Sequence, residues 1–444
     1  MTELDAMRKI LILGLVWGNY GAAMAHVGEP SVQSIRFIGE APGRAWIVVE
    51  NVGLLVEEAG GFRWLCDEAI TPLPGLQDLA ITGGDGQRWT AATRNGVFVT
   101  EDGGCTFTAL SGPLAQHVIG LVSPHGGHAG EALITTQTLG LTNDVYRTTD
   151  GGRSWRPAGL ELPGRVRALL RAQGDPNVVY ITHATGALRS DDGGQSFAPI
   201  TLGPPGANVA GSDFELLGTR PGRADEVLAV AVEFPRAHLL RTEDGGASWE
   251  TVHTFDDIPE SLVFSADGTQ ALLSLPFEGL YRSRDGGDTW VPSPAPPESP
   301  WLSCLTRAPE GDTIWACARR GGAWLVASSV DFGLTWTPRF GLDFAEIMGS
   351  WACEPSTSTS QNCVAACDRS TQACSGGDGG VDLGHDRPLD AGRAVHNSGA
   401  DAHVSRPATR RRAASSCQTG DGTASLIVGL LLWGGYRRPR KRLI

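Results

Sequence analysis

The sequence predicts an all-β protein that folds as a seven-bladed β-propeller of four-stranded blades. A short motif recurs along the chain at intervals of 41 to 52 residues, which is the length of one such blade. Between the copies, short apolar runs alternate with turn residues. No segment shows a sustained helical period, and the 59 Gly and 27 Pro residues suit a chain rich in turns.

The motif has six clear copies and one worn copy. The clear copies are TEDGGCTF (100–107), TTDGGRSW (148–155), SDDGGQSF (190–197), TEDGGASW (242–249), SRDGGDTW (283–290) and SVDFGLTW (329–336). They share a central aspartate, which is Asp102, Asp150, Asp192, Asp244, Asp285 or Asp331. In the worn copy, EAGGFRW (58–64), Ala59 stands at the position of the aspartate. One blade for each copy gives seven blades.

Local chemistry explains the residue types in the motif. Asp followed by Gly is a hairpin-turn signal, because Gly accepts a positive φ. The carboxylate can accept hydrogen bonds from backbone N–H groups of its own turn, and the preceding Ser or Thr can do so more weakly. The closing aromatic, which we expect to bury a large apolar area, is in four copies Trp155, Trp249, Trp290 and Trp336. The motif therefore predicts a fastened turn between two strands of one blade.

The residues between two motifs fit four short strands. In the segment 165–200, apolar runs at 166–170 and 178–182 flank the turn at 174–176, residues 186–188 lead into the motif, and residues 197–200 leave it. We expect a strand near residues 32–37 to open blade one. The segment 344–351 resembles a further first strand, and we expect it to help close the ring.

These motifs resemble the Asp-box or BNR repeat of sialidase-like propellers, sortilin-type receptors, xyloglucanases and photosystem assembly factors. The resemblance covers residues 30–350. It implies that the motifs lie at the blade periphery, remote from the central channel, and that their aspartates and tryptophans are structural. Calcium is the alternative ligand for the aspartates, but it needs more oxygen ligands than one carboxylate and a turn supply. We expect no cofactor and no metal.

The N-terminus is typical of a secretory signal peptide over residues 1–25. Arg8 and Lys9 precede an apolar run at 10–17, and a small-residue cleavage site at 23–25 follows. The apolar run is too short to span a bilayer, which disfavours the alternative of a retained anchor. The sequence therefore predicts an exported chain.

The C-terminus combines three features in order: Cys417, a short apolar stretch at 424–436, and a basic cluster at 437–442. This order, over residues 417–444, resembles the myxobacterial C-terminal sorting segment (MYXO-CTERM). The resemblance implies anchoring at the cell surface or outer membrane of a Gram-negative bacterium, a sorting or processing protease as a partner, and processing or lipid attachment at Cys417. A plain membrane helix is the alternative. Residues 375–416 carry few large apolar side chains and are predicted to be a disordered spacer.

Nine cysteines in an exported chain predict eight paired residues and one left over, Cys417. Cys304 and Cys317 flank a turn at 310–311, where a hairpin sets them opposite each other. The next four cysteines are expected to form a small two-disulfide module over residues 351–374, with zinc as the competing interpretation; they are Cys353, Cys363, Cys367 and Cys374. Cys66 and Cys105 remain as a pair by elimination.

Charge and motifs limit the function classes. The net charge of −13 argues against nucleic acid as a partner, because nucleic-acid affinity comes largely from neutralised phosphates. A sialidase requires an early Arg-Ile-Pro signature, whereas the string at 35–37 is Ile-Arg-Phe. It also requires a Tyr–Glu nucleophile pair, but Tyr146, Tyr180 and Tyr281 all lie at structural strand positions.

A glycoside hydrolase of the xyloglucanase type would need two carboxylates facing each other across a cleft. The sequence offers Asp213, Glu215, Asp256 and Asp257 as candidates, although acids in loops are common. The pair at His125 and His128 could bind a metal but is more simply explained as solvated. We therefore predict a surface-anchored binding or scaffold protein for a protein or glycan ligand, with the glycoside hydrolase as the alternative.

Overall fold

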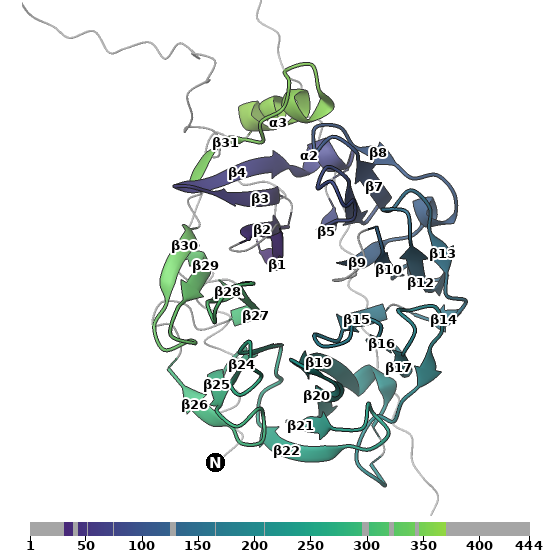
Figure 1. The fold of residues 1–444 in the computed structure, drawn as a ribbon, viewed down its shortest axis with the longest axis vertical. Coiled ribbons are helices and arrows are strands. Elements are labelled where there is room, and N and C mark those ends of the chain that lie inside the picture. Colours follow the sequence, from purple (N-terminus) through teal and green to yellow (C-terminus); the bar gives the residue numbers. More distant parts are fainter. Residues whose placement is uncertain are drawn as a thin grey trace, which may run out of the picture. The chain divides into compact units, whose positions relative to one another are not determined.

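The computed structural model describes residues 31–38, 43–50, 52–73, 75–124, 130–164, 166–207, 209–294, 302–318, 324–341 and 346–369. These residues form seven four-stranded antiparallel units around a ring, so the predicted seven-bladed propeller is confirmed (Figure 1). The predicted opening strand is β1 (Val32–Ile38). The motif at each clear copy joins the third and fourth strands of a blade, as expected from its turn chemistry.

The first four blades follow the chain in order. Blade one is β1, β2 (Arg44–Val49), β3 (Gly53–Glu58) and β4 (Gly61–Cys66); blade two is β5 (Leu76–Ile81), β6 (Trp89–Thr93), β7 (Gly96–Thr100) and β8 (Thr108–Ala109). Blade three is β9 (Ile119–Pro124), β10 (Ala132–Thr136), β12 (Val145–Thr148) and β13 (Arg156–Pro157); blade four is β15 (Val166–Arg171), β16 (Val179–His183), β17 (Gly186–Ser190) and β18 (Ala198–Pro199). A separate two-stranded pair joins β11 (Thr142–Asn143) to β14 (Leu162–Pro163).

The last three blades have the same order. Blade five is β19 (Phe214–Arg220), β20 (Arg223–Glu233), β21 (Arg236–Thr242) and β22 (Glu250–Phe255); blade six is β23 (Ser261–Phe264), β24 (Ala271–Leu275), β25 (Gly279–Ser283) and β26 (Val291–Ser293); blade seven is β27 (Leu302–Arg307), β28 (Ile314–Ala318), β29 (Trp324–Ser329) and β30 (Thr337–Gly341). The remaining elements are β31 (Ile347–Ser350), α2 (Asp67–Ile70), α3 (Ser358–Arg369), η1 (Pro113–Gln116) and η2 (Gly211–Asp213).

The core lies between the blades. Every residue of the second strands β6, β10, β16, β24 and β28 is buried. Each of these strands has a neighbour on both edges, and both faces of its sheet pack against adjacent blades. Burial on both faces explains why these strands do not show the strict alternation of apolar and polar residues that a half-exposed strand shows.

The segment after blade seven returns to blade one in an unexpected way. β31 pairs in parallel with β4 at the outer edge of blade one, so it is a fifth, outermost strand and not the first strand that the sequence predicted. β4 is the fourth strand of blade one, so its outer edge has no partner within the blade and can accept β31. The turn that joins β3 to β4 has Gly60 at φ +97° in the worn copy of the motif. Aromatic contacts between blades seven and one also close the ring, with Phe37 packed edge-on against Trp315.

The cysteine pairing differs from the prediction in two of the three disulfide bonds found among the described residues. Cys304 is bonded to Cys317, as expected for a hairpin. The pairing of Cys66 with Cys105 is wrong, because Cys66 is bonded to Cys363 and Cys105 to Cys353. The expected two-disulfide module is therefore wrong as well.

The reason for these pairings is the path of the chain beyond β31. That segment crosses back over blades one and two, where the Trp351 indole donates to the carbonyl of Gly103 and Thr359 to that of Gly104. The helix α3 then packs against α2. The side chain of Cys367, and Cys374 with the spacer and the C-terminal segment that includes Cys417, lie outside the described residues.

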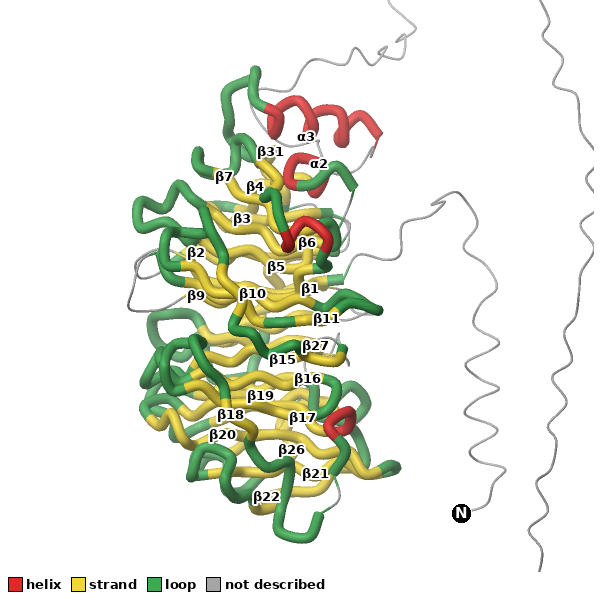
Figure 2. The backbone as a smooth tube through the Cα atoms, turned by 90° about the vertical axis from the view of Figure 1, so that its right-hand side faces the viewer, coloured by secondary structure: helices red, strands yellow, loops and turns green. Residues whose placement is uncertain are grey.

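The propeller has two different faces, because consecutive strands of a blade are antiparallel. The Asp motifs and the turns between first and second strands lie on one face, which we call the turn face. The turns between second and third strands and the connections between blades lie on the other, which we call the connecting face. The short helices α2, η1 and η2 all belong to connections between blades, and Figure 2 shows the helical segments along one side of the ring.

Candidate binding surfaces

The six motifs form one recurrent turn, which we call the Asp turn. At Asp192, the Ser190 hydroxyl and the Ser196 backbone N–H donate to Oδ1 at 2.7 and 2.9 Å, and the Ser196 hydroxyl donates to Oδ2 at 2.6 Å. The Gly194 N–H in turn donates to the Ser190 hydroxyl. Both carboxylate oxygens are therefore used within the turn.

The other five turns repeat this pattern. A hydroxyl two residues before the aspartate and the N–H and hydroxyl four residues after it donate to the carboxylate in each case. The Ser or Thr four residues after the aspartate was present in every copy, but the sequence reasoning gave it no role. Burial raises the pKa of Asp192, but the hydrogen bonds from Ser196 and Ser190 outweigh this effect and lower the pKa to about 2.

The closing tryptophans differ in burial. Trp249 and Trp290 are 4% and 5% exposed, whereas Trp155 and Trp336 are half-buried. The Trp249 indole donates to the Thr201 carbonyl beyond blade four, so it joins two blades. The Trp155 and Trp290 indoles donate to a glycine carbonyl of their own turn.

Four Asp turns carry an arginine three residues before the aspartate, a feature that the sequence analysis did not identify, and in three of them it contacts the next blade. In blade four, Arg189 pairs with Asp225 of blade five at 2.6 Å. In blade five, Arg241 pairs with Asp288 in the Asp turn of blade six. Arg282 of blade six donates to the Phe332 carbonyl in the Asp turn of blade seven. These contacts explain why the arginine recurs at this spacing.

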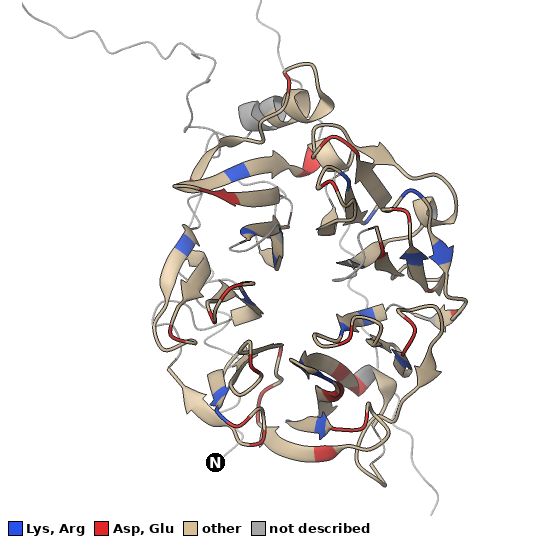
Figure 3. Ribbon diagram, in the orientation of Figure 1, with Lys and Arg blue, Asp and Glu red and all other residues tan. Residues whose placement is uncertain are grey.

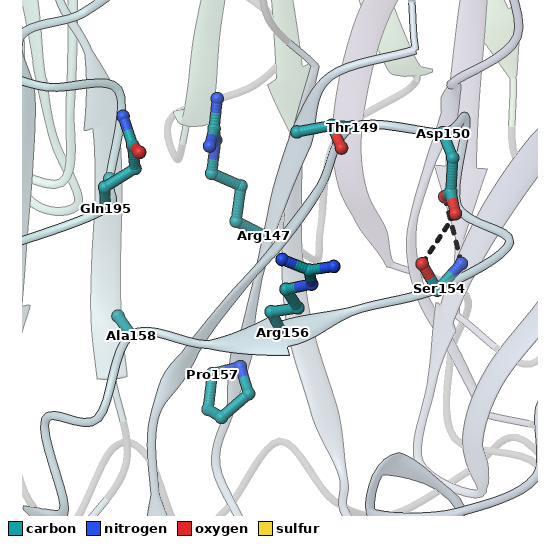
Figure 4. Close-up of a pocket in the computed structure, with 9 residues that line it drawn as sticks. Arg147, Thr149, Asp150, Ser154, Arg156, Pro157, Ala158 and Gln195 are labelled. Carbon is teal, nitrogen blue, oxygen red and sulfur yellow. Dashed lines mark hydrogen bonds between the residues drawn. The ribbon is translucent and has the colours of Figure 1, made fainter.

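The fourth such arginine, Arg147 of blade three, lines a pocket at the boundary with blade four (Figure 4). The pocket has a volume of about 340 Å³, and its lining residues are Arg147, Thr149, Asp150, Ser154, Arg156, Pro157, Ala158, Gly194 and Gln195. Figure 4 shows the Arg147 and Arg156 side chains extending in the same direction, with Gln195 to one side of them. Arg147 also pairs with Glu131 of its own blade at 3.0 Å.

Polar side chains tie the innermost strands of neighbouring blades. Arg36 of β1 donates to Asp78 of β5 at 2.7 Å and to the Val122 carbonyl of β9 at 2.8 Å. Arg167 of β15 lies 3.6 Å from the Glu215 carboxylate of β19. Charges of both signs are distributed around the ring (Figure 3). Ion pairs thus link innermost strands of neighbouring blades. One of them uses Arg36, the arginine of the Ile-Arg-Phe string at 35–37.

Large exposed apolar side chains gather on the connecting face. Six of the nine that the described residues contain lie in second-to-third turns or in connections between blades; they are Leu73, Leu139, Leu141, Phe234, Ile258 and Phe277. Phe234 is 93% exposed and Phe277 is 77% exposed. They are spread around that face, with Leu73 between blades one and two, Leu139 and Leu141 in blade three, and the other three residues at blades five and six.

Three of these residues, Phe234, Ile258 and Phe277, form what we call the blade 5–6 patch. Asp257 joins two of their loops, because its carboxylate accepts from the backbone N–H of Ile258 at 2.8 Å and of Phe277 at 2.6 Å. Asp256, in the same loop, lies 3.9 Å from Arg236 in the Phe234 turn. The three apolar residues therefore lie on loops that contact one another.

The predicted carboxylate candidates do not form a facing pair. Asp213 and Glu215 lie at the start of the innermost strand β19, whereas Asp256 and Asp257 follow the outermost strand β22. The strand register places these two ends in one row across the sheet. Three strand spacings of about 4.8 Å separate them by roughly 14 Å, which is more than either glycosidase mechanism uses.

The remaining candidates also have structural surroundings. Tyr180 is fully buried and donates to the Ala224 carbonyl at 2.9 Å, and Tyr281 donates to Glu278 at 2.8 Å. Tyr146 lies in β12. His125 and His128 lie outside the described residues. Where the chain is described, no group of three His, Cys, Asp or Glu side chains could hold a metal ion.

In the part of the chain that the structure describes, no helix has the length and apolar character needed to cross a bilayer.

Comparisons with known proteins agree with the fold. No protein-family model matches the chain. The chain is similar to the photosystem II assembly protein Ycf48 of Synechococcus sp. (strain JA-3-3Ab), with 23% identity over 51% of this chain and 76% of that protein. It is also similar to a xyloglucanase of Paenibacillus sp, with 27% identity over 45% of this chain but only 20% of that protein.

Solved structures give the same picture. The extracellular domain of a hybrid two component system from B. thetaiotaomicron matches with a TM-score of 0.50 and 14% identity, over 68% of this chain and 38% of that chain. A structure of Ycf48 bound to a D1 peptide matches with a TM-score of 0.44 and 21% identity, over 60% of this chain and 82% of that chain. At 14% identity, the similarity to the extracellular domain from B. thetaiotaomicron shows a shared fold and nothing finer.

Proposed function

We propose that this chain is an exported, surface-anchored propeller that binds a protein partner on its connecting face and acts as a binding or scaffold protein. The observation that carries the proposal is the blade 5–6 patch, where three large exposed apolar side chains lie on loops that contact one another. Aromatic side chains are frequent anchors of protein interfaces, and the blade 5–6 patch presents two exposed phenylalanines. The relative Ycf48 bears the name of an assembly protein, which is consistent with a partner of this class.

The surroundings of the patch indicate the chemistry of the partner. Glu233 and Asp256 are 88% and 85% exposed beside it, and Glu278 lies next to Phe277. Arg236 is the one basic side chain in the same loops among the described residues 233–236, 256–258 and 276–278. An apolar centre with an acidic rim is complementary to a polypeptide segment that carries apolar and basic side chains.

A glycoside hydrolase is less well supported by these residues. The four candidate carboxylates lie at opposite edges of blade five. The Asp257 carboxylate accepts hydrogen bonds from backbone N–H groups, and Glu215 pairs with Arg167. The similarity to the xyloglucanase covers a fifth of that enzyme. A glycan ligand therefore remains as one outcome of the binding test below.

Export and anchoring rest on the sequence features of the two ends, with support from the disulfides. Disulfide bonds persist in oxidising compartments, and three join described residues of this chain. We propose the repeats to be Asp boxes, because a carboxylate bound within its own turn is consistent with the structural role that the resemblance implies for these aspartates.

Binding to arrays of synthetic peptides and of glycans tests the proposal. We expect the propeller to retain peptides that combine apolar and basic residues. The double variant Phe234→Ser/Phe277→Ser should weaken this binding by about tenfold or more, because it removes two aromatic anchors. Both side chains are exposed, so the variant should unfold at the same temperature as the wild type.

The matched control is Val330→Ser/Leu334→Ser, which removes two exposed apolar side chains from an Asp turn on the turn face. It should leave peptide binding unchanged. Equal weakening by both double variants, or retention of glycans and no peptides, would contradict a protein-binding connecting face.

A further inference from the structure

The repeats provide an internal comparison for the pocket between blades three and four. At the next two blade boundaries the corresponding arginine meets a carboxylate of the following blade. Arg189 meets Asp225, and Arg241 meets Asp288. The two acids occupy different positions: Asp225 precedes the buried part of the second strand, and Asp288 follows the turn aspartate by three residues.

Both of these positions are neutral in blade four. The residue equivalent to Asp225 is Asn177, since its carbonyl accepts from Gly193 as the Asp225 carbonyl accepts from Gly245. The residue equivalent to Asp288 is Gln195, three residues after Asp192. Arg147 thus faces a neighbouring blade that supplies no carboxylate at either position, and a pocket of about 340 Å³ lies there instead.

The charges around this pocket favour an anion. Arg147 and Arg156 both line it, and Arg156 is exposed to solvent. Of the acids nearby, Asp150 is held by Ser154 and Thr148 within its own turn. Glu131 pairs with Arg147 from within blade three and lies in the field of a third arginine, Arg171. Hydrogen bonds leave the Asp150 carboxylate charged, so the three arginines exceed the two acids by one positive charge.

We propose that this pocket is a binding site for an anionic group, either a carboxylate or a tetrahedral oxyanion such as sulfate or phosphate. The guanidinium groups of Arg147 and Arg156 present N–H donors in the fork geometry that suits such groups. The anion takes the place that Asp225 and Asp288 fill at the neighbouring boundaries. The volume of the pocket lies at the lower end of the range for small-molecule sites, so the anionic group can belong to a larger ligand. The site is on the turn face and is independent of the proposed protein-binding face.

Titration calorimetry of the whole chain with sodium acetate, sulfate and phosphate tests the site, with ionic strength held constant by chloride. We expect saturable binding of at least one of these anions. Acetate alone would assign the site to carboxylates, and sulfate or phosphate would assign it to tetrahedral oxyanions. Arg156→Gln should weaken that binding by about tenfold or more, because it removes one charge-assisted contact.

Two further variants separate a built site from general charge attraction. Gln195→Asp places a carboxylate at the position of Asp288 and should abolish anion binding while the protein stays folded. Arg153→Gln removes an exposed arginine of the same turn that pairs with Glu101 outside the pocket, and should leave binding unchanged. The proposal would be overturned by the absence of saturable binding, by equal losses in Arg153→Gln and Arg156→Gln, or by full binding in Gln195→Asp.

Discussion

Trp249 offers the sharpest test of how the Asp turns hold the propeller together. Its ring is 4% exposed and lies edge-on to Phe214 with the ring centres 5.3 Å apart. Its indole N–H donates to the Thr201 carbonyl at 2.9 Å, across the boundary between blades four and five. Truncation to alanine removes all of these contacts from a buried cluster that spans both blades.

The expected loss can be worked from these contacts. A buried tryptophan side chain removes about 200 Å² from water, and about 25 cal/mol per Å² gives an upper value of about 5 kcal/mol. Truncation leaves a cavity that the surrounding residues fill only in part, which adds to the lost stability. We therefore expect Trp249→Ala to lower the free energy of unfolding by about 3–5 kcal/mol. Trp249→Phe keeps most of the apolar contact and should cost about 1–2 kcal/mol, largely through the unpaired Thr201 carbonyl.

Urea titration followed by far-ultraviolet circular dichroism measures both losses. The matched control is Trp155→Ala, at the same position of blade three, where the ring is half-buried and its N–H bonds within its own turn. We expect the control to cost less than Trp249→Ala by about 1 kcal/mol or more, in proportion to the smaller buried area. Equal losses at the two positions would refute the argument that Trp249 couples two blades.

Three further predictions follow from the turns, the disulfides and the C-terminus. Asp192→Ala should lower the free energy of unfolding by about 1–2 kcal/mol without changing ligand binding. Because the folded state lowers the pKa of Asp192 from 3.8 to about 2, the contribution of this carboxylate to stability is complete above pH 4 and is lost as the pH falls towards 2. Asp192→Asn should therefore flatten that part of a pH–stability curve. Non-reducing peptide mapping should recover Cys66 with Cys363 and Cys105 with Cys353, and Cys66→Ser/Cys363→Ser should cost about 2–5 kcal/mol in a thermal or urea titration. Cys417→Ser should block processing or surface retention while the propeller stays folded; mass spectrometry that finds an intact C-terminus and an unmodified Cys417 thiol in surface-extracted protein would favour a plain membrane helix instead.

The parts of the fold that the sequence predicted correctly are those whose partners are close along the chain. The carboxylate of each Asp turn takes its hydrogen bonds from residues within four positions, so the motif alone determines the local structure. Cys304 and Cys317 are likewise close along the chain, and they lie opposite each other on the two strands of one hairpin. The number of blades follows from the repeat length for the same reason.

The cysteine errors arose where partners are distant along the chain. The partner of Cys66 is 297 residues away, and its position depends on where the chain passes after the seventh blade. The sequence places four cysteines within 22 residues after that blade, which favoured a local module. The docking of Trp351 and Thr359 on the turn of blade two carries the segment across two blades, and no residue spacing in the sequence indicates these contacts.

The two candidate surfaces were unpredicted for different physical reasons. Phe234 and Phe277 lie in short turns, EFPR and PFEG, where a large apolar residue has no core to enter. Once the strand boundaries are known, the alternation of antiparallel strands assigns both turns to one face, so a correct blade alignment contains this information. No residue spacing reveals it, because the two turns belong to different blades.

The anion pocket required a comparison between repeats rather than a motif. The arginine three residues before the aspartate is visible in four copies. In three of them it meets a carboxylate or a carbonyl of the next blade, whereas Arg147 pairs with Glu131 of its own blade. A ligand can replace an internal contact at a blade boundary where this arginine is present but the acid opposite it is replaced by a neutral residue. In this chain that repeat is blade four, where Asn177 and Gln195 stand in the acidic positions opposite Arg147.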